Sequence, residues 1–526
     1  MSVRIFILKY EYLLILVDII IYDNYLSYMI ILKGTKVKEW NQKVKHFLKS
    51  ELIRRGLTNE DLVSLLSQIG ISETKASVDN KISRASFSAT FLLQCLYAMN
   101  YNDLQKSMPL EKYSQTELSN IVYNTDLFVS PHNSDKYRHK SGTQYIDIND
   151  FAFNPLTNKK IVSLFTGAGG LEIGLEMVGF ETCICVEIDD DCRETLKHNR
   201  PNWLVYEDSK DGIKGDIRAI EPTEILEASK LDKGEAAIVS GGAPCQPFSN
   251  IGKKNGASDP KNGDLFMEFV RIVKGIMPKA FIFENVAGIT QSKHSEVVNY
   301  MKHAFNGLGY GIDYKVLNAA DYGVSQRRER FFLIGIHGIE KPAFPLPTHY
   351  KGLSEWQKFI SELDHAPNYS PKPWIKLKAV LDMIPKDNVK RNDYALMNIS
   401  DKVRKRMELV GPGENFKVLP KKMLPNCWKS GRHQGQDTFG RLRLDEPSVT
   451  IRTAAYNPAK GKYIHPTENR GLSTIEMAAI QDFPYEWEFK VKNGKKVTLV
   501  SGGRQIGNAV PPSLAKAIGI AIKKQL

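Results

Sequence analysis

The chain has 526 residues, of which 42% are hydrophobic and 25% charged, so it is long enough for about two to four globular domains and too long for one ordinary core. Its formal net charge of +13 favours a polyanionic partner such as a nucleic acid. The six cysteines form no CxxC pair and show no Cys/His ligand spacing, which argues against a zinc site or a disulfide framework and fits a reducing cytoplasm.

Residues 1–35 are rich in Ile, Leu and Tyr. Charged residues such as Lys9, Glu11 and Asp18 interrupt every apolar run well short of the roughly 18 residues that a membrane helix needs. We therefore expect no transmembrane helix and no membrane partner. One hypothesis is that Met29 is the natural start and that residues 1–28 are a translated upstream segment.

Residues 36–105 have the pattern of a small helical domain. Gly56 can end one helix, and Gly70 provides a turn before a polar helix over 72–84. This order resembles the repressor-type helix-turn-helix, whose second helix enters the major groove, although a helical bundle used for protein contact remains the alternative. The side chains predicted to contact DNA here are Lys75, Asn80 and Arg84.

The pattern changes twice more along the chain. Residues 106–158 are rich in Asn, Ser, Tyr and Lys, and we expect a linker. Over 159–338, apolar β-branched runs alternate with amphipathic helices, which predicts a parallel, doubly wound α/β sheet. A less regular, strongly basic region follows over 339–440. We expect the last segment, 441–526, to support that region and then to return to the α/β domain, since α/β-like patterning resumes at Leu472.

The first strand of the α/β region, over 161–164, runs into a glycine-rich turn and a helix, an arrangement that cradles nucleotides. Glu172 stands where the dinucleotide fingerprint has its third glycine, and the acidic surroundings suit a pyrophosphate badly. Glu187 ends the second strand and can accept hydrogen bonds from ribose hydroxyls, while Asp216 can accept from an adenine amino group. An adenosine without phosphates indicates S-adenosylmethionine as the cofactor.

Cys245 lies in a small-residue turn directly after an apolar run, between Pro244 and Pro247. A lone cysteine in such a loop is more often a buried structural residue, so its neighbours in the fold decide the interpretation. Glu284 ends an apolar strand, where desolvation would raise the pKa of its carboxyl so that it can share a proton with a ring nitrogen. Arg328 and Arg330 fall on one face of an extended segment and could hold a phosphate or a carbonyl oxygen, or stabilise a thiolate.

Together these blocks resemble the cytosine-C5 DNA methyltransferases of bacterial restriction-modification systems. The blocks, in chain order, are the strand with its glycine turn, Pro-Cys-Gln at 244–246, Glu-Asn-Val at 284–286, Gln-Arg-Arg-Glu-Arg at 326–330 and Gln-Ile-Gly-Asn-Ala-Val-Pro at 505–511. The resemblance spans 159–526. It implies an α/β, Rossmann-like methyltransferase domain dependent on S-adenosylmethionine, with an inserted target-recognition region over 339–440, behind an all-α, helix-turn-helix-like domain.

The resemblance also implies residue roles. Cys245 would add to C6 of a cytosine flipped out of the duplex, Glu284 would hold N3, Arg330 would bond O2, and Arg328 would support the thiolate and a nearby phosphate. The implied cofactor contacts are Phe165, Gly167, Gly169, Glu187, Asp216, Ile217, Pro244, Asn508 and Val510. A mobile loop over 249–264 would bring Ser249, Lys253 and Lys254 to the DNA, and no metal is expected.

Two departures from the family pattern concern local geometry, because Ser163 and Ser325 stand where many relatives have Asp and Pro. The favoured function is methylation of C5 of cytosine in a specific duplex DNA site, in the cytoplasm, beside a partner restriction endonuclease. Methylation of cytosine in transfer RNA is one alternative. Another is a DNA-binding regulator with an inactive methyltransferase body, and a related hypothesis is that the helical domain lets the enzyme repress its own promoter.

Overall fold

The computed structural model describes residues 57–68, 71–84, 136–149, 158–208, 212–243, 265–290, 302–367, 369–429 and 437–526, with seven single helical positions before residue 100. The chain divides into two compact units, Met1–Phe128 and Val129–Leu526, which are described separately. In the described part of the chain, no helix is both long and apolar enough to cross a membrane.

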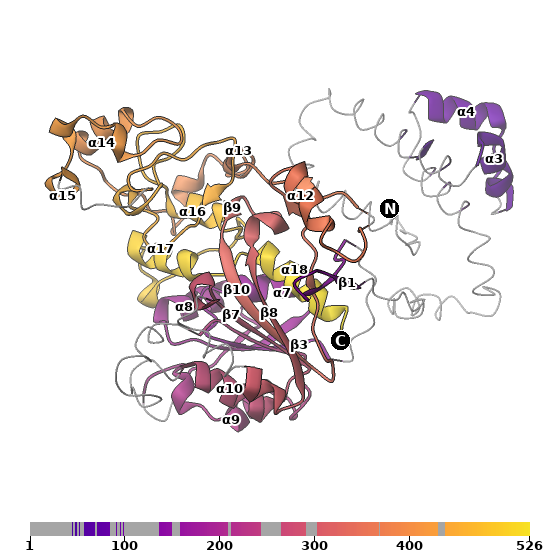
Figure 1. Cartoon of the computed structure of the whole chain (residues 1–526), viewed down its shortest axis with the longest axis horizontal. Coiled ribbons are helices and arrows are strands. Elements are labelled where there is room, and N and C mark those ends of the chain that lie inside the picture. Colours follow the sequence, from indigo (N-terminus) through magenta and orange to yellow (C-terminus); the bar gives the residue numbers. More distant parts are fainter. Residues whose placement is uncertain are drawn as a thin grey trace, which may run out of the picture. The chain divides into compact units, whose positions relative to one another are not determined.

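The second unit is built on a seven-stranded sheet in the order β5-β4-β3-β6-β7-β10-β8 (Figure 1). The strands are β3 (Lys160–Leu164), β4 (Glu181–Val186), β5 (Leu204–Val205), β6 (Ile238–Gly241), β7 (Ala280–Val286), β8 (Tyr310–Asn318) and β10 (Glu329–His337). Strands β3 to β7 are mutually parallel, whereas β10 runs antiparallel to both of its neighbours. The predicted Rossmann-like α/β class is confirmed.

Helices cover both faces of this sheet. The helices α7 (Gly170–Glu176) and α18 (Pro512–Lys523) pack together on one face, where a Cβ on Gly174 would lie 2.2 Å from the Pro512 carbonyl oxygen. The opposite face carries α9 (Pro222–Ser229) and α10 (Leu265–Ile276), whose apolar sides bury residues such as Phe269. The sheet is therefore apolar on both faces, as expected for parallel strands.

The linker predicted over 106–158 is wrong for residues 136–149. Strands β1 (Lys136–Arg138) and β2 (Gln144–Ile146) form an antiparallel hairpin, and β2 pairs in parallel with β11 (Phe344–Pro345). Tyr137 and Tyr145 are buried in the core of the sheet domain. Three-residue strands offer too few positions for a visible alternation, so the hairpin was hidden in a polar segment.

The region after β10 is less regular, as predicted. Up to Leu363 it stays with the core of the sheet domain, and only further on does a separate small core form around Phe416 and Phe439. Its described elements are β12 (His349–Tyr350), α12 (Leu353–Ile360), β13 (Lys372–Pro373), α13 (Leu377–Leu381), α14 (Asp401–Glu408) and α15 (Asn426–Lys429). The chain returns through β14 (Ser448–Val449), which pairs with β9 (Gln326–Arg327), then α16 (Thr474–Ile480), α17 (Leu499–Asn508) and α18.

In the first unit, α3 (Asn59–Gln68) and α4 (Lys75–Arg84) are two ten-residue helices. Thr58 and Asp61 cap the first one, since the Asp61 carboxylate accepts a hydrogen bond from the Thr58 backbone N–H at 2.7 Å. Apolar residues of both helices, including Leu62 and Val78, share one small core. The segment 1–35 lies outside the described residues.

Candidate active site

A cavity of about 700 Å³ opens at the carboxyl edge of the sheet. It is lined by the residues that follow β3, β4, β6 and β7, by the start of β10 and by the end of α17. This is the edge at which open α/β sheets bind ligands, and the volume is in the range of small-molecule sites. The predicted residues that line it are Phe165, Gly167, Glu187, Asp216, Ile217, Glu284, Arg330, Asn508 and Val510.

The turn after β3 is shaped by its backbone. Phe165 has a φ of 52°, an unusual value for a side-chain-bearing residue, and Gly167 follows with a φ of 58°. A Cβ on Gly170 would lie 2.2 Å from the carbonyl oxygen of Val510, so the turn and the C-terminal segment touch backbone to backbone. Gly169, which was predicted to contact the cofactor, lies outside the cavity lining and is the N-cap residue of α7. A Cβ on Gly169 would lie 3.0 Å from the side chain of Leu196.

Glu187 is buried at the end of β4 and both of its carboxylate oxygens accept backbone hydrogen bonds. One comes from the Gly167 N–H at 2.6 Å and the other from the Asp189 N–H at 2.8 Å. Burial raises the pKa of Glu187, while these two bonds oppose the rise. Each carboxylate oxygen has a second lone pair, so each can accept one more hydrogen bond. A Cβ on Gly215 would lie 2.0 Å from the Glu187 carbonyl oxygen, which explains how Asp216 comes to the same cavity.

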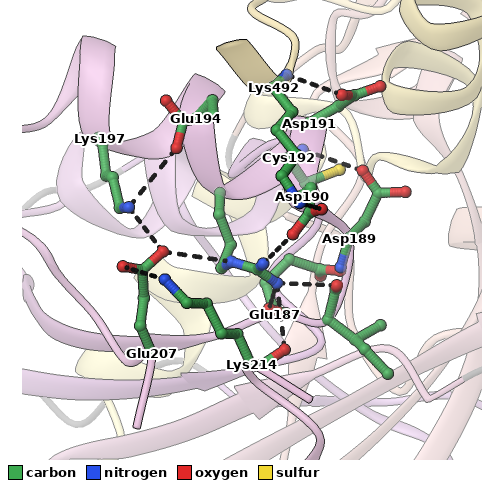
Figure 2. Close-up of polar contacts among 12 residues, drawn as sticks. Glu187, Asp189, Asp190, Asp191, Cys192, Glu194, Lys197, Glu207, Lys214 and Lys492 are labelled. Carbon is green, nitrogen blue, oxygen red and sulfur yellow. Dashed lines mark hydrogen bonds and ion pairs between the residues drawn. The ribbon is translucent and has the colours of Figure 1, made fainter. Parts of the chain in front are cut away.

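A polar network around the first turn of α8 (Asp190–Asn199) holds Glu187 in place (Figure 2). The buried Arg193 guanidinium donates to the carbonyl oxygens of Glu187 at 2.9 Å and Lys214 at 3.1 Å. Arg504 of α17 pairs with the Asp189 and Asp191 carboxylates, each at 3.0 Å. The network therefore ties the end of β4 to α17, whose last residues also line the cavity.

The other end of the cavity holds Glu284 and Arg330, which lie on the neighbouring strands β7 and β10. Their side chains form an ion pair, with 3.0 Å between Arg330 Nε and Glu284 Oε1. Burial raises the pKa of the Glu284 carboxyl, and the positive charges of Arg330 and Arg328 oppose that rise. Next to it, the Asn285 amide donates to the Ala243 carbonyl oxygen at 3.0 Å and so holds the segment that leads to position 245.

Arg328 is fully buried and lies outside the cavity lining. Its guanidinium donates to the backbone carbonyl oxygens of Ile451, Gly507 and Ala509. Two of these hydrogen bonds tie Arg328 to backbone that lines the cavity. Its role beside a thiolate and a phosphate stays a prediction, because Cys245 lies outside the described residues.

Glu172, read from the sequence only as an obstacle to pyrophosphate, is a buried residue of the cavity wall. Its Oε1 accepts hydrogen bonds from Ser163 Oγ at 2.7 Å and Ser240 Oγ at 3.1 Å, and burial raises its pKa to about 7. Ser163, which stands where many relatives have Asp, therefore donates a hydrogen bond to a carboxyl group of α7. Serine in a strand facing a glutamate in the glycine-turn helix was the signal that could have revealed this pair.

Several predicted residues lie outside the described part of the chain, namely Pro244, Cys245, Ser249, Lys253 and Lys254. In the first unit, Lys75 and Asn80 are exposed on α4, and Lys75 pairs with Glu60 at 2.7 Å. Arg84 is the last residue of that helix. Within the described residues there is no group of three or more His, Cys, Asp or Glu side chains placed to hold a metal ion.

Comparison with known proteins assigns the second unit. The family of C-5 cytosine-specific DNA methylases matches residues 159–524, and a domain of unknown function, DUF6471, matches residues 40–104. The type II methyltransferase M.Sau96I of Staphylococcus aureus is 36% identical over 455 residues, which cover 85% of this chain and 94% of the relative. M.PspPI of Psychrobacter sp. is 33% identical over 386 residues, and this alignment covers 72% of this chain and 82% of the relative. The crystal structure of Spodoptera frugiperda DNMT2 covers 69% of this chain and 99% of its own at 16% identity, with a TM-score of 0.45.

The family match includes the four segments whose ends line the cavity. The alignment with the S. aureus enzyme is too long to lie within 159–526, so it also includes part of the preceding region. The chain belongs to the C-5 cytosine-specific DNA methylases, enzymes that methylate C5 of cytosine in DNA.

Proposed function

We propose that the chain methylates a cytosine flipped out of a specific duplex DNA site, using S-adenosylmethionine and a covalent adduct through Cys245. The observation that carries this proposal is the cavity itself, which places the carboxylate of Glu187 at one end and the Glu284–Arg330 pair at the other. One cavity thus offers acceptors for an adenosine and a charged pair for a base.

The residues at the first end fit the cofactor. Glu187 would accept hydrogen bonds from the ribose, and Ile217 and Val510 offer apolar surface beside it. Asp216 also lines the cavity, although Arg218 holds its carboxylate by a hydrogen bond from Nε at 2.9 Å. When bound there, S-adenosylmethionine would supply an electrophilic methyl group.

At the second end, each side chain has a part in activating the base. The Cys245 thiolate would add to C6, so that electron density moves onto C5 and a proton is needed at N3. C5 would then take the methyl group from the sulfonium of the donor. A base would finally remove the C5 proton, and the thiolate would leave C6, which restores the aromatic ring. Glu284 can hold that proton because burial favours its neutral form, and Arg330 would bond the O2 atom of the base. A base in a duplex cannot reach this cavity, so it must be flipped out of the stack, at a cost of about a few kcal/mol.

Duplex DNA is the favoured substrate because the region 339–440 presents many exposed cations. They include Lys402, Arg404, Lys405, Lys417, Lys421, Lys422 and Lys429. Such a surface neutralises phosphates along a DNA backbone. By its likeness to type II enzymes, the methylation would protect DNA from a partner restriction endonuclease.

The test is expression of the wild type and Cys245→Ala in a methylation-free host, followed by bisulfite sequencing of the DNA. Methylated cytosines in one short sequence with the wild type, and none with the variant, are the expected result. A tritium-transfer assay that labels transfer RNA but no duplex DNA would refute the substrate, and an active Cys245→Ala variant would refute the nucleophile.

We also propose that the N-terminal unit binds DNA and represses the promoter of its own gene. The supporting observation is the helix pair α3 and α4, which shares one core and leaves Lys75 and Asn80 exposed on the second helix. Deletion of residues 1–110 should abolish promoter occupancy, whereas unchanged occupancy would refute this role.

A further inference from the structure

The chain segment that leads to Arg330 carries two completely buried polar residues, Gln326 at the start of β9 and Arg328 between β9 and β10. Both point at backbone groups of the C-terminal part of the chain. Arg328 Nη1 donates to the Ile451 carbonyl oxygen at 2.8 Å, and Nη2 donates to those of Gly507 at 2.7 Å and Ala509 at 2.9 Å.

Gln326 and Gln481 complete this buried network. The Gln326 amide accepts from the Ile451 N–H at 2.9 Å and donates to Gln481 Oε1 at 2.8 Å. Gln481 in turn donates to the Ala509 carbonyl oxygen at 2.5 Å, so that this oxygen receives hydrogen bonds from both Gln481 and Arg328. The charged donor makes the Arg328 bonds the stronger part of the network.

The segment held by this network is the C-terminal wall of the cavity. Asn508 ends α17 and stands between Gly507 and Ala509, whose carbonyl oxygens Arg328 binds. Asn508 and Val510 both line the cavity. The carbonyls at the end of a helix have no partner within it and carry a partial negative charge, so a guanidinium is well suited to bind them. On the other side, a Cβ on Gly507 would lie 2.4 Å from the backbone nitrogen of Thr453, which leaves the turn little room to move.

We propose that Arg328 is a positioning residue for the methyl donor: it fixes the 507–510 turn so that Asn508 and Val510 form the cofactor wall. The inference rests on the proposed function, because it takes the cavity to be the site of S-adenosylmethionine. It also connects the two ends of the site, since Arg330, two residues along the same chain segment, pairs with Glu284 at the opposite end.

The test compares Arg328→Met and Arg328→Lys with a matched control, Arg327→Met. Arg327 is the preceding residue and pairs at the surface with Glu446, 3.7 Å away. Methionine keeps much of the volume of Arg328 without donors, and a compact lysine ammonium cannot span several carbonyls. Calorimetric titration of the full-length protein with S-adenosylmethionine, without DNA, should give a Kd about tenfold or more higher for Arg328→Met and unchanged for Arg327→Met.

If Arg328 positions the cofactor wall, its substitution should weaken binding of S-adenosylmethionine and leave binding of DNA unchanged. Affinity for duplex DNA and formation of a covalent adduct with 5-fluorocytosine DNA at saturating cofactor should stay near the wild-type values in Arg328→Lys, while its KM for the cofactor rises. An unchanged cofactor Kd together with slower adduct formation would overturn the inference and return Arg328 to the thiolate.

Two further outcomes remain decisive. If Arg328→Met does not fold, Gln481→Leu, which removes the other donor to the Ala509 carbonyl, should raise the cofactor Kd in the same direction, and an unchanged Kd in Gln481→Leu and Arg328→Lys refutes the inference. Wild-type protein that binds no S-adenosylmethionine at all refutes the proposed cofactor site itself, which distinguishes that failure from a failure of Arg328 alone.

Discussion

The two ends of the cavity both present a buried glutamate, but they hold it by different means. Glu187 is held by two backbone N–H groups, whereas Glu284 is held by the Arg330 side chain. Backbone donors are neutral and fixed by the fold, while a guanidinium is charged and sits on a side chain that can rotate. This difference fits the proposed roles, in which Glu187 is a permanent acceptor for the cofactor and Glu284 changes its protonation during the reaction.

The largest expected effect is at Glu284. Glu284→Gln removes the proton that the carboxyl can share with N3, so kcat should fall by about 10²- to 10⁴-fold. The Kd for S-adenosylmethionine should stay near the wild-type value, because Glu284 lies at the other end of the cavity. Tritium-transfer kinetics measure kcat, and calorimetry measures the Kd for the cofactor. A Glu284→Gln variant with normal kcat would show that the protonation of Glu284 is not needed in the reaction.

Between the two ends lies Glu172, a third buried carboxyl whose bound donors are the hydroxyls of Ser163 and Ser240. Its pKa is raised from 4.5 to about 7, so the folded state retains a proton that the unfolded state releases as the pH rises above 4.5. Stability should therefore fall across this window, by up to about 3 kcal/mol.

Glu172→Gln should remove this pH dependence, since glutamine has no proton to lose. Urea unfolding at pH 5 and pH 8 measures it in both proteins. Glu176→Gln is the control, because the Glu176 carboxylate lies on the same helix and binds Arg200 at 2.9 Å. If the free energy of unfolding changed equally between pH 5 and pH 8 in the wild type and in Glu172→Gln, groups other than Glu172 would cause the pH dependence.

The contrast between these carboxyls also shows what the sequence could predict. Glu187 and Glu284 each end an apolar strand, and the carboxyl ends of parallel strands meet at one edge, so the sheet and both ends of the cavity followed from local pattern. The hydrogen-bond partners of Arg328 could not be predicted from local pattern, because Ile451 and Ala509 lie 123 and 181 residues further along the chain. The contact of Glu172 with Ser240 could not be predicted either, because Ser240 lies 68 residues further along the chain, on a different strand.

At the cofactor end, Glu187→Gln should raise the Kd for S-adenosylmethionine about ten- to a hundredfold. Both oxygens of Glu187 accept backbone hydrogen bonds, and an amide can accept only on one side, so one N–H group would face a donor. At saturating cofactor kcat should largely recover, unlike in Glu284→Gln. Loss of kcat without a change in Kd would place Glu187 in the reaction rather than in binding.

The smallest expected effect concerns the ionic contacts behind Glu187. Arg504 pairs with Asp189 and Asp191 at 3.0 Å, but its side chain is 43% exposed, so solvent and salt screen these pairs. Arg504→Ala should lower the free energy of unfolding by about 0.5 kcal/mol at low salt and by less at 1 M salt. Thermal unfolding at both salt concentrations measures the difference. A large loss that salt does not reduce would mean that the backbone bonds of Glu187 depend on this side chain, and the cofactor end would then be no more fixed than the end that holds Glu284.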